Sequence, residues 1–115
     1  MYKRQVVQAA EVSGSSLDDF GALLAHLATL HPSRYGAVLD GINRVCLTGL
    51  TPVPDQNVAL RLVVLVDRLY DRQVELVTSG LPLDSLFSAE MLAGGYRKKY
   101  RRAISRLVAL ARLAT

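Results

Sequence analysis

Residues 44–79 read RVCLTGLTPVPDQNVALRLVVLVDRLYDRQVELVTS, and this stretch decides the fold. Residues 44–50 are short, apolar and β-rich, which is typical of a strand buried on both faces of a sheet. After the loop TPVPD, Asp55 is a natural N-cap for a helix over about 56–72. Residues 74–79 predict a second strand of the same buried kind. Strand, helix and strand at this spacing predict a βαβ unit, with two parallel strands and a right-handed crossover.

The predicted crossover helix is apolar on nearly all sides. Its apolar residues are Val58, Leu60, Leu62, Val63, Leu65, Val66 and Leu69. Such a helix needs cover on more than one side. Because sheets usually contain about four to six strands, two strands are too few for an independent α/β sheet. The sequence therefore predicts a helix-rich α/β fold that is part of a sheet domain needing further strands.

The N-terminal segment predicts one strand and two helices. YKRQVVQAAEV, residues 2–12, has a few alternating apolar positions and predicts an edge strand. The tripeptide GSS predicts a break, after which Ser16 or Asp18 caps a helix that ends at Pro32. The apolar residues of this helix at helical spacing are Phe20, Leu23, Leu24, Leu27 and Leu30. Ser33 is expected to cap a short second helix with the sequence RYGAVLDGI, stopped near Gly41.

The C-terminal segment predicts a basic amphipathic helix. LDSLF and SAEML predict short helical turns, the Gly94-Gly95 pair predicts a hinge, and the last helix runs from about Tyr96 to Leu113. Its apolar stripe contains Leu92, Tyr96, Tyr100, Ala103, Ile104, Leu107, Leu110, Ala111 and Ala114. Its opposite side carries Lys98, Arg101, Arg102 and Arg112. The helix is therefore expected to dock by one face, burying both tyrosines, and to present cations on the other.

The charge of the chain is unevenly distributed. The 115 residues carry a formal net charge of +4, and their composition, half apolar and about a fifth charged, predicts one globular domain over 1–115. Residues 1–90 hold seven Lys/Arg against ten Asp/Glu, or −3, whereas residues 91–115 hold seven Lys/Arg and no acid, or +7. The positive field is therefore local to the C-terminal helix.

Several classes of protein are disfavoured by the sequence. No apolar run approaches the roughly 20 residues of a membrane-spanning helix, and the N-terminus lacks the apolar segment of a signal peptide. Cys46 is the single cysteine, so a reducing, cytoplasmic setting is expected, with Cys46 as a small core residue. His26, His31 and Cys46 have no structural-zinc spacing, and no metal site is predicted. Neither a Ser-His-Asp nor a Cys-His catalytic set is indicated.

Nucleotide-binding loops are absent from the sequence. It contains neither GxxxxGK[ST] nor GxGxxG. The Gly94-Gly95 pair follows no buried strand, so it does not predict a phosphate loop. The strand ends remain candidates, because ligands of parallel α/β sheets lie beyond the carboxyl ends of the strands. Thr48, Thr78 and Ser79 either orient a water or phosphate there, or satisfy backbone groups of the next turn.

The cationic side chains leave further alternatives open. Arg61, surrounded by apolar residues, either extends to the surface or forms part of a site. Asp67, Arg68, Asp71 and Arg72 are expected to pair locally.

The basic helix is either a solvated face, a nucleic-acid contact or a phosphate-charge sensor. Membrane binding is disfavoured because the apolar stripe is needed for docking. As a sensor it would use Arg102 and Arg106, one helical turn apart, because a fork of donors suits phosphate. Buried tyrosines argue against nucleic acid, since they cannot stack on bases.

Three segments resemble the C-terminal third of the ZapE/Afg-like AAA-type ATPases. A family pattern like RRFxxLxDxxYD is matched by Arg61, Leu65, Asp67, Tyr70 and Asp71. A pattern like VxLVxSAxxP is matched by Val74, Leu76, Val77 and Ser79, with Pro82 and Leu86-Phe87 fitting loosely. A pattern like RTxSRL is matched by Arg102, Ser105, Arg106 and Leu107. The resemblance is clearest over residues 44–108 and looser over 17–43.

The resemblance implies a partial P-loop-type fold and a role in ATP-driven remodelling of proteins. In bacteria the family acts at the division ring of the tubulin-like protein, and in mitochondria in protein quality control. Departures from the family are SGLP in place of SAxxP, RRAISRL in place of RTxSRL, and a missing Glu-Met after that motif. The family's ATP and Mg²⁺ are held by a phosphate loop and an acidic segment that these residues do not include. The chain alone should therefore not hydrolyse ATP.

This resemblance gives the main hypothesis and leaves two rivals. In the main hypothesis, Arg102 and Arg106 compensate charge on a nucleotide bound by another segment or subunit, with Thr78, Ser79 and Arg61 as weaker nucleotide-sensing candidates. The remaining cations are either solvated or bind a protein partner. The parallel pair with its apolar crossover helix would expose a large patch unless the N-terminal helices or self-association cover it, and the remaining ATPase segment is a further expected partner. One rival is a stand-alone protein- or nucleic-acid-binding module that uses the basic helix. The other is a truncated gene product.

Overall fold

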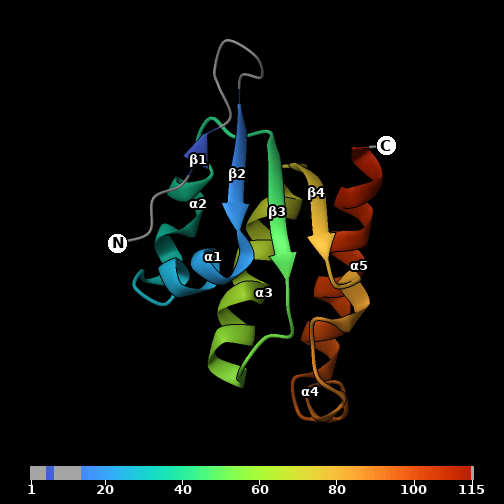
Figure 1. Cartoon of the computed structure of the whole chain (residues 1–115). Coiled ribbons are helices and arrows are strands. Elements are labelled where there is room, and N and C mark those ends of the chain that lie inside the picture. Colours follow the sequence, from blue (N-terminus) through green and yellow to red (C-terminus); the bar gives the residue numbers. More distant parts are fainter. Residues whose placement is uncertain (1–4, 7–13, 115) are drawn as a thin grey trace.

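The computed structural model describes residues 5–6 and 14–114 and shows a single sheet with helices packed against it (Figure 1). The four strands lie in the order β1-β2-β3-β4. Strands β2, β3 and β4 are parallel, and β1 is antiparallel to β2. Their bounds are β1 Gln5–Val6, β2 Ser15–Asp19, β3 Arg44–Leu50 and β4 Glu75–Gly80. The α/β class is confirmed, and β1 confirms the part of the predicted edge strand that lies within the described residues.

The helices follow the strands in alternation, as a parallel sheet requires. They are α1 Phe20–Leu27, the 3₁₀ turn η1 Pro32–Arg34, α2 Tyr35–Val38, α3 Gln56–Asp71, the 3₁₀ turn η2 Leu83–Ser85, α4 Ala89–Ala93 and α5 Arg97–Leu113. Figure 1 shows α3 behind the sheet and α5 along the β4 side. Every helix of the described part is too short or too polar to cross a membrane.

The predicted βαβ unit is present with nearly the predicted bounds. Strands β3 and β4 pair in parallel with Val45 opposite Leu76, and α3 forms the crossover between them. The Asp55 side chain caps α3 by accepting a hydrogen bond of 2.9 Å from the backbone N–H of Val58. The two turns predicted in LDSLF and SAEML appear as η2 and α4. Local capping and periodicity were therefore sufficient to predict this half of the fold.

The N-terminal third differs from the prediction, because Ser15–Asp19 forms strand β2 and α1 begins only at Phe20. Ser16 and Asp18 are buried on the helix-covered face of β2 and are not helix caps. Ser16 Oγ donates a 2.9 Å hydrogen bond to Asp18 Oδ2. Asp19 caps α1, accepting from the N–H of Ala22 at 2.9 Å. Parallel pairing with β3 overrides the local turn preference of the sequence GSS.

The predicted second helix over RYGAVLDGI is also wrong in its extent. It is divided into η1 and the four-residue α2, and ends at Val38. Its start is capped by His31, whose Nδ1 accepts from the N–H of Ser33 at 3.1 Å, and not by Ser33. The chain then turns at Gly41, which has a φ of +76°. That left-handed conformation stops a helix and favours glycine.

The crossover helix α3 has the cover that its apolar surface requires. Sheet, α1, α2 and α5 surround it, and α3 contributes the buried residues Ala59, Leu62, Val63, Leu65, Val66 and Leu69. The strands contribute Val45, Leu47, Leu50 and Leu76 to the same core. The prediction that other elements cover α3 on more than one side is therefore confirmed. Each fully buried aliphatic side chain contributes roughly 1.5–3 kcal/mol relative to exposure.

The opposite face of the sheet is open among the described residues, so β3 and β4 are not buried on both faces as predicted. Leu17, Cys46 and Val77 occupy adjacent register positions across β2, β3 and β4. Leu17 is 38% exposed and Val77 is 44% exposed. Cys46 is half-buried and is not the core residue that the sequence predicted. The prediction was wrong because these strands carry apolar residues on both faces. An apolar strand sequence does not show whether helices cover one face of the sheet or both.

Candidate functional site

Helix α5 presents a row of cations at the carboxyl end of the parallel strands. In Figure 1 its N-terminal half and α4 lie at the end of the molecule toward which the arrows of β2, β3 and β4 point. The exposed cations in this half are Arg97, Lys98, Lys99, Arg101 and Arg102. Its buried face contains Tyr100, Ala103, Leu107 and Leu110. The amphipathic helix is as predicted, except that Tyr96 is 39% exposed whereas Tyr100 is buried.

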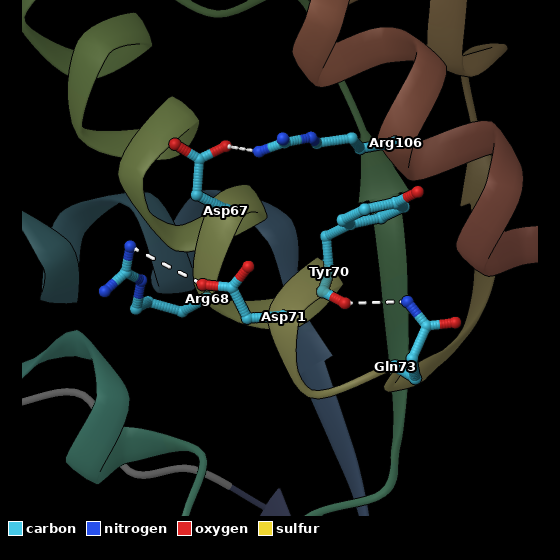
Figure 2. Close-up of polar contacts among 6 residues, drawn as sticks. All are labelled: Asp67, Arg68, Tyr70, Asp71, Gln73 and Arg106. Carbon is cyan, nitrogen blue, oxygen red and sulfur yellow. Dashed lines mark hydrogen bonds and ion pairs between the residues drawn. The ribbon is translucent and has the colours of Figure 1, made fainter.

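Arg106 ties α5 to α3. Its Nη1 donates to Asp67 Oδ1 at 2.5 Å, and its guanidinium lies 4.8 Å from the centre of the Tyr70 ring (Figure 2). The Arg106 and Asp67 side chains are 28% and 25% exposed. Partial burial and a second, cation–π contact make this a stronger interaction than a surface ion pair. The arrangement fixes Arg106 within the chain and orients α5 relative to α3.

The Asp67–Arg106 pair should therefore show measurable energetic coupling. We expect a double-mutant cycle with Asp67→Ala and Arg106→Ala to give a coupling free energy of about 1–2 kcal/mol, because each truncation leaves a half-buried charge without its partner. The measurement is urea unfolding of the four proteins. Arg68 and Asp71, 3.7 Å apart and 48% and 61% exposed, provide the control cycle. Their coupling should be about 0.3 kcal/mol. Equal coupling in the two cycles would contradict a special role for Arg106.

Arg102 differs from Arg106 although the two are one helical turn apart. Its side chain is exposed, and it forms no ion pair or hydrogen bond within residues 5–6 and 14–114. The neighbouring buried residue Ala103 keeps this part of the helix docked. Arg102 is therefore free to meet an anion, whereas Arg106 would first have to leave Asp67.

One of the three hydroxyl groups predicted at the strand ends, that of Ser79, forms a hydrogen bond between two strands. Gly49 N donates to Ser79 Oγ at 3.3 Å, which joins the ends of β3 and β4. Asp19 stands opposite Thr48 in the register of β2 and β3, and both side chains are exposed. Thr78 is half-buried on the helix-covered face. Ser79 thus satisfies a backbone group and Asp19 caps α1, while the exposed Thr48 remains available at this edge. Asp19, the last residue of β2, was not predicted as a site residue, because the sequence predicted a helix at this position and not the end of a strand.

Arg61 lies away from α5, at the contact between α3 and α1. Its Nη1 donates to the backbone carbonyl oxygens of Leu30 at 3.2 Å and Leu27 at 3.4 Å. These carbonyl groups lie at the C-terminal end of α1, where cations are favourable. Arg61 therefore stabilises a helix end. The structure does not join it to Arg102 and Arg106 in one cluster.

The acidic and basic residues at the end of α3 pair partly outside their own helix. Arg68 and Asp71 form the predicted local pair. Asp67 binds Arg106 of α5, and Arg72 binds Asp40 at 3.3 Å. These longer-range pairs were not predicted, because i,i+4 spacing describes neighbours on one helix and carries no information about other helices.

Among the described residues, burial shifts the pKa of two titratable groups. Burial raises the pKa of the Asp18 carboxyl from 3.8 to about 6. Burial, followed by the influence of Tyr96, raises the pKa of Tyr100. The Tyr100 hydroxyl is buried without a hydrogen-bond partner among the described residues. Asp18 lies under the helices and Tyr100 lies in α5, so neither shift produces an acid–base pair.

The described residues do not fit a bound triphosphate with its metal ion. No group of three His, Cys, Asp or Glu side chains able to hold a metal occurs in the described part. The sequence contains no GxxxxGK[ST] loop for the β- and γ-phosphates. What these residues offer is an exposed arginine, a fixed arginine and polar groups at the strand ends.

Comparison with protein families identifies the family of the chain. A family model described as AFG1-like ATPase matches residues 2–114, nearly the whole chain. The chain belongs to the AFG1-like ATPase family. Comparisons with curated proteins and with solved structures gave no match. The family suggests ATP and Mg²⁺ as ligands of complete members. The ZapE/Afg-like resemblance and the partial P-loop-type fold are thus confirmed.

Proposed function

We propose that this chain is the segment of an AFG1-like ATPase that assists hydrolysis with arginine while other residues hold the triphosphate. The observation that carries the proposal is the contrast on α5 between the free Arg102 and the anchored Arg106. Arg102 would meet the negative charge of the phosphates, since its fork of N–H donors suits phosphate oxygens. Arg106, held by Asp67 Oδ1 and packed over Tyr70, would keep α5 in register and serve as a positioning residue.

Three features support this division of roles. Arg102 is in the half of α5 that lies at the carboxyl end of the sheet, where ligands of parallel sheets bind. Asp19, Thr48 and the Gly49–Ser79 contact occupy the same end of the strands. Both arginines fall in the segment RRAISRL that matches the family. A guanidinium that compensates charge developing in the transition state contributes several kcal/mol to catalysis.

The test replaces the arginines aligned with Arg102 and Arg106 in a complete family member that carries its own phosphate loop. We expect Arg102→Ala to lower kcat by about a hundredfold, or about 2.7 kcal/mol, with an unchanged melting temperature. Arg102→Lys should restore only part of the activity, because a lysine offers a point charge without the fork. Arg106→Ala should lower both kcat and the melting temperature, since it also releases Asp67.

The control is Arg68→Ala, which removes an equal charge from an exposed pair on α3. It should change kcat less than twofold. Wild-type kcat in the Arg102→Ala enzyme would overturn the assignment. The purified chain by itself should show no ATP turnover, and turnover that survives removal of contaminants would overturn the proposal as a whole.

Finer roles follow from the family resemblance. We infer ATP-driven remodelling of a protein partner in the cytoplasm, with bacterial cell division or protein quality control as the process. The tubulin-like division protein is the partner suggested for the first of these. The open sheet face, with Leu17 and Val77 exposed, supports cover by the remaining ATPase segment or by a second copy of the chain. Sizing of the chain with and without that segment tests which one covers it.

A further inference from the structure

The cations in the first half of α5 are not neutralised by acidic side chains of the described residues. Arg97 Nη1 donates to the carbonyl oxygen of Gly94 at 3.1 Å, and Arg101 Nη2 to that of Leu92 at 3.1 Å. These carbonyl contacts orient the two guanidinium groups without cancelling their charge. Lys98 and Arg102 are exposed beside them. Positions four residues apart lie one helical turn, about 5.4 Å, from each other, so the cations form two short rows.

An aromatic ring is exposed beside these cations. Tyr96 is 39% exposed, and Lys99 Nζ lies 5.9 Å from the centre of its ring. Its other neighbour is Tyr100, at 6.4 Å between ring centres in an edge-to-face arrangement. Exposure of Tyr96 removes the objection, drawn from the sequence, that both tyrosines are buried. A cationic helix with an accessible aromatic face has the two groups that single-stranded nucleic acids need.

A cavity opens at the start of α5. It has a volume of about 700 Å³, and its lining includes Asp55, Glu90, Met91, Tyr96 and Tyr100. The size lies within the range of small-molecule sites. Tyr100 is 1% exposed and its hydroxyl is buried, so Tyr96 is the aromatic residue of this lining that a ligand can reach.

We propose that this surface binds single-stranded nucleic acid, which goes beyond the proposed role in ATP hydrolysis and is independent of it. The phosphates follow Arg97, Lys98, Lys99 and Arg101, the exposed cations in the first half of α5 that the proposed role in hydrolysis does not use, and one base enters the cavity and stacks on Tyr96. The carboxylates of Asp55 and Glu90 accept hydrogen bonds from amino groups of the base, as acidic side chains do with cytosine. An acidic protein segment supplies negative charge, but its carboxylates offer no flat ring to stack on Tyr96. The exposed ring beside the cations therefore favours nucleic acid over an acidic protein as the occupant.

The experiment measures fluorescence anisotropy of labelled 20-nucleotide oligothymidylate and oligocytidylate with the full chain. The logarithm of the association constant should fall with log salt at a slope of about −2.8, because each of the four cations Arg97, Lys98, Lys99 and Arg101 contributes about 0.7. The double variant Lys98→Gln/Lys99→Gln should reduce the magnitude of this slope by about 1.4. Tyr96→Leu should weaken binding about tenfold with the slope unchanged, because it removes stacking and no charge.

The control variant Arg34→Gln/Arg68→Gln also removes two positive charges. Both residues are exposed, and neither lines the cavity. Arg34 belongs to η1, and Arg68 lies near the C-terminal end of α3. It should leave the slope unchanged. Circular dichroism verifies that each variant is folded, and the lysine variant keeps the test valid if Tyr96→Leu unfolds. Absence of binding at low salt, an equal effect of the control variant, or binding of polyglutamate but not of oligonucleotides would each overturn the proposal.

Discussion

Replacing Gly80 by alanine is expected to destabilise the fold by about 3–5 kcal/mol. Gly80 ends β4 with a φ of +105°, a conformation that residues with a Cβ rarely adopt. A Cβ at this position would lie 2.4 Å from the backbone N of Leu50 and 2.8 Å from its carbonyl oxygen. These atoms belong to β3, so no side-chain rotation relieves the clash. The loss would be a large share of the 5–15 kcal/mol typical of a domain.

The measurement is urea unfolding of Gly80→Ala followed by circular dichroism. Separation of the ends of β3 and β4 should also break the 3.1 Å hydrogen bond from Leu81 N to Leu50 O. Gly95→Ala is the matched control, because a Cβ there meets nothing within 4 Å and its φ is not positive. It should change the stability by less than about 0.5 kcal/mol. An unfolding midpoint for Gly80→Ala equal to that of the wild type would show that the two strand ends do not approach as described.

Replacing Asp18 by asparagine is expected to stabilise the fold by up to about 3 kcal/mol at pH 8. Asp18 is 1% exposed, and burial raises its pKa to about 6 from 3.8. The folded state therefore favours the protonated carboxyl. Its contribution to stability is fully present below about pH 4 and is lost as the pH rises through 6. Asparagine is neutral at every pH and keeps an oxygen that accepts the hydrogen bond from Ser16 Oγ.

The test compares urea unfolding of wild type and Asp18→Asn between pH 4 and pH 8. The difference in unfolding free energy should be near zero at pH 4, should grow through pH 6 and should be constant above about pH 7. Asp84→Asn, at an exposed position in η2, is the control and should show no such growth. A difference that does not depend on pH would mean that Asp18 is ionised in the folded chain throughout this range.

The sequence predicted the second half of the fold better than the first. Residues 44–80 combine two apolar strands with a long, largely apolar helix and an Asp55 cap, so local signals and tertiary packing agree there. Residues 14–19 give no such agreement, since Ser16 and Asp18 favour turns and caps in isolation. In the folded chain they form the central strand β2, where backbone pairing with β3 and the Ser16–Asp18 hydrogen bond satisfy them.

The sequence predicted which residues belong to the candidate site, but it did not predict which of them contact one another. Arg102 and Arg106 were identified together from RRAISRL, and only the structure distinguishes the free arginine from the anchored one. The partner of Arg106 is Asp67, 39 positions earlier in the chain. No helical period relates two residues on different helices. Thr78 and Ser79 were likewise selected as a pair, although adjacent strand residues point to opposite faces and only Ser79 meets Gly49.

The amino-acid order alone determined the βαβ unit, the amphipathic basic helix and membership of the family, because each depends on periodicity, capping or motifs within short segments. The tertiary structure alone decided which sheet face stays open, which tyrosine of α5 is exposed and which arginine is held. These features depend on contacts between segments that are far apart in the sequence. The free energy of such contacts comes from packing one segment against another, and the sequence of a single segment does not show it.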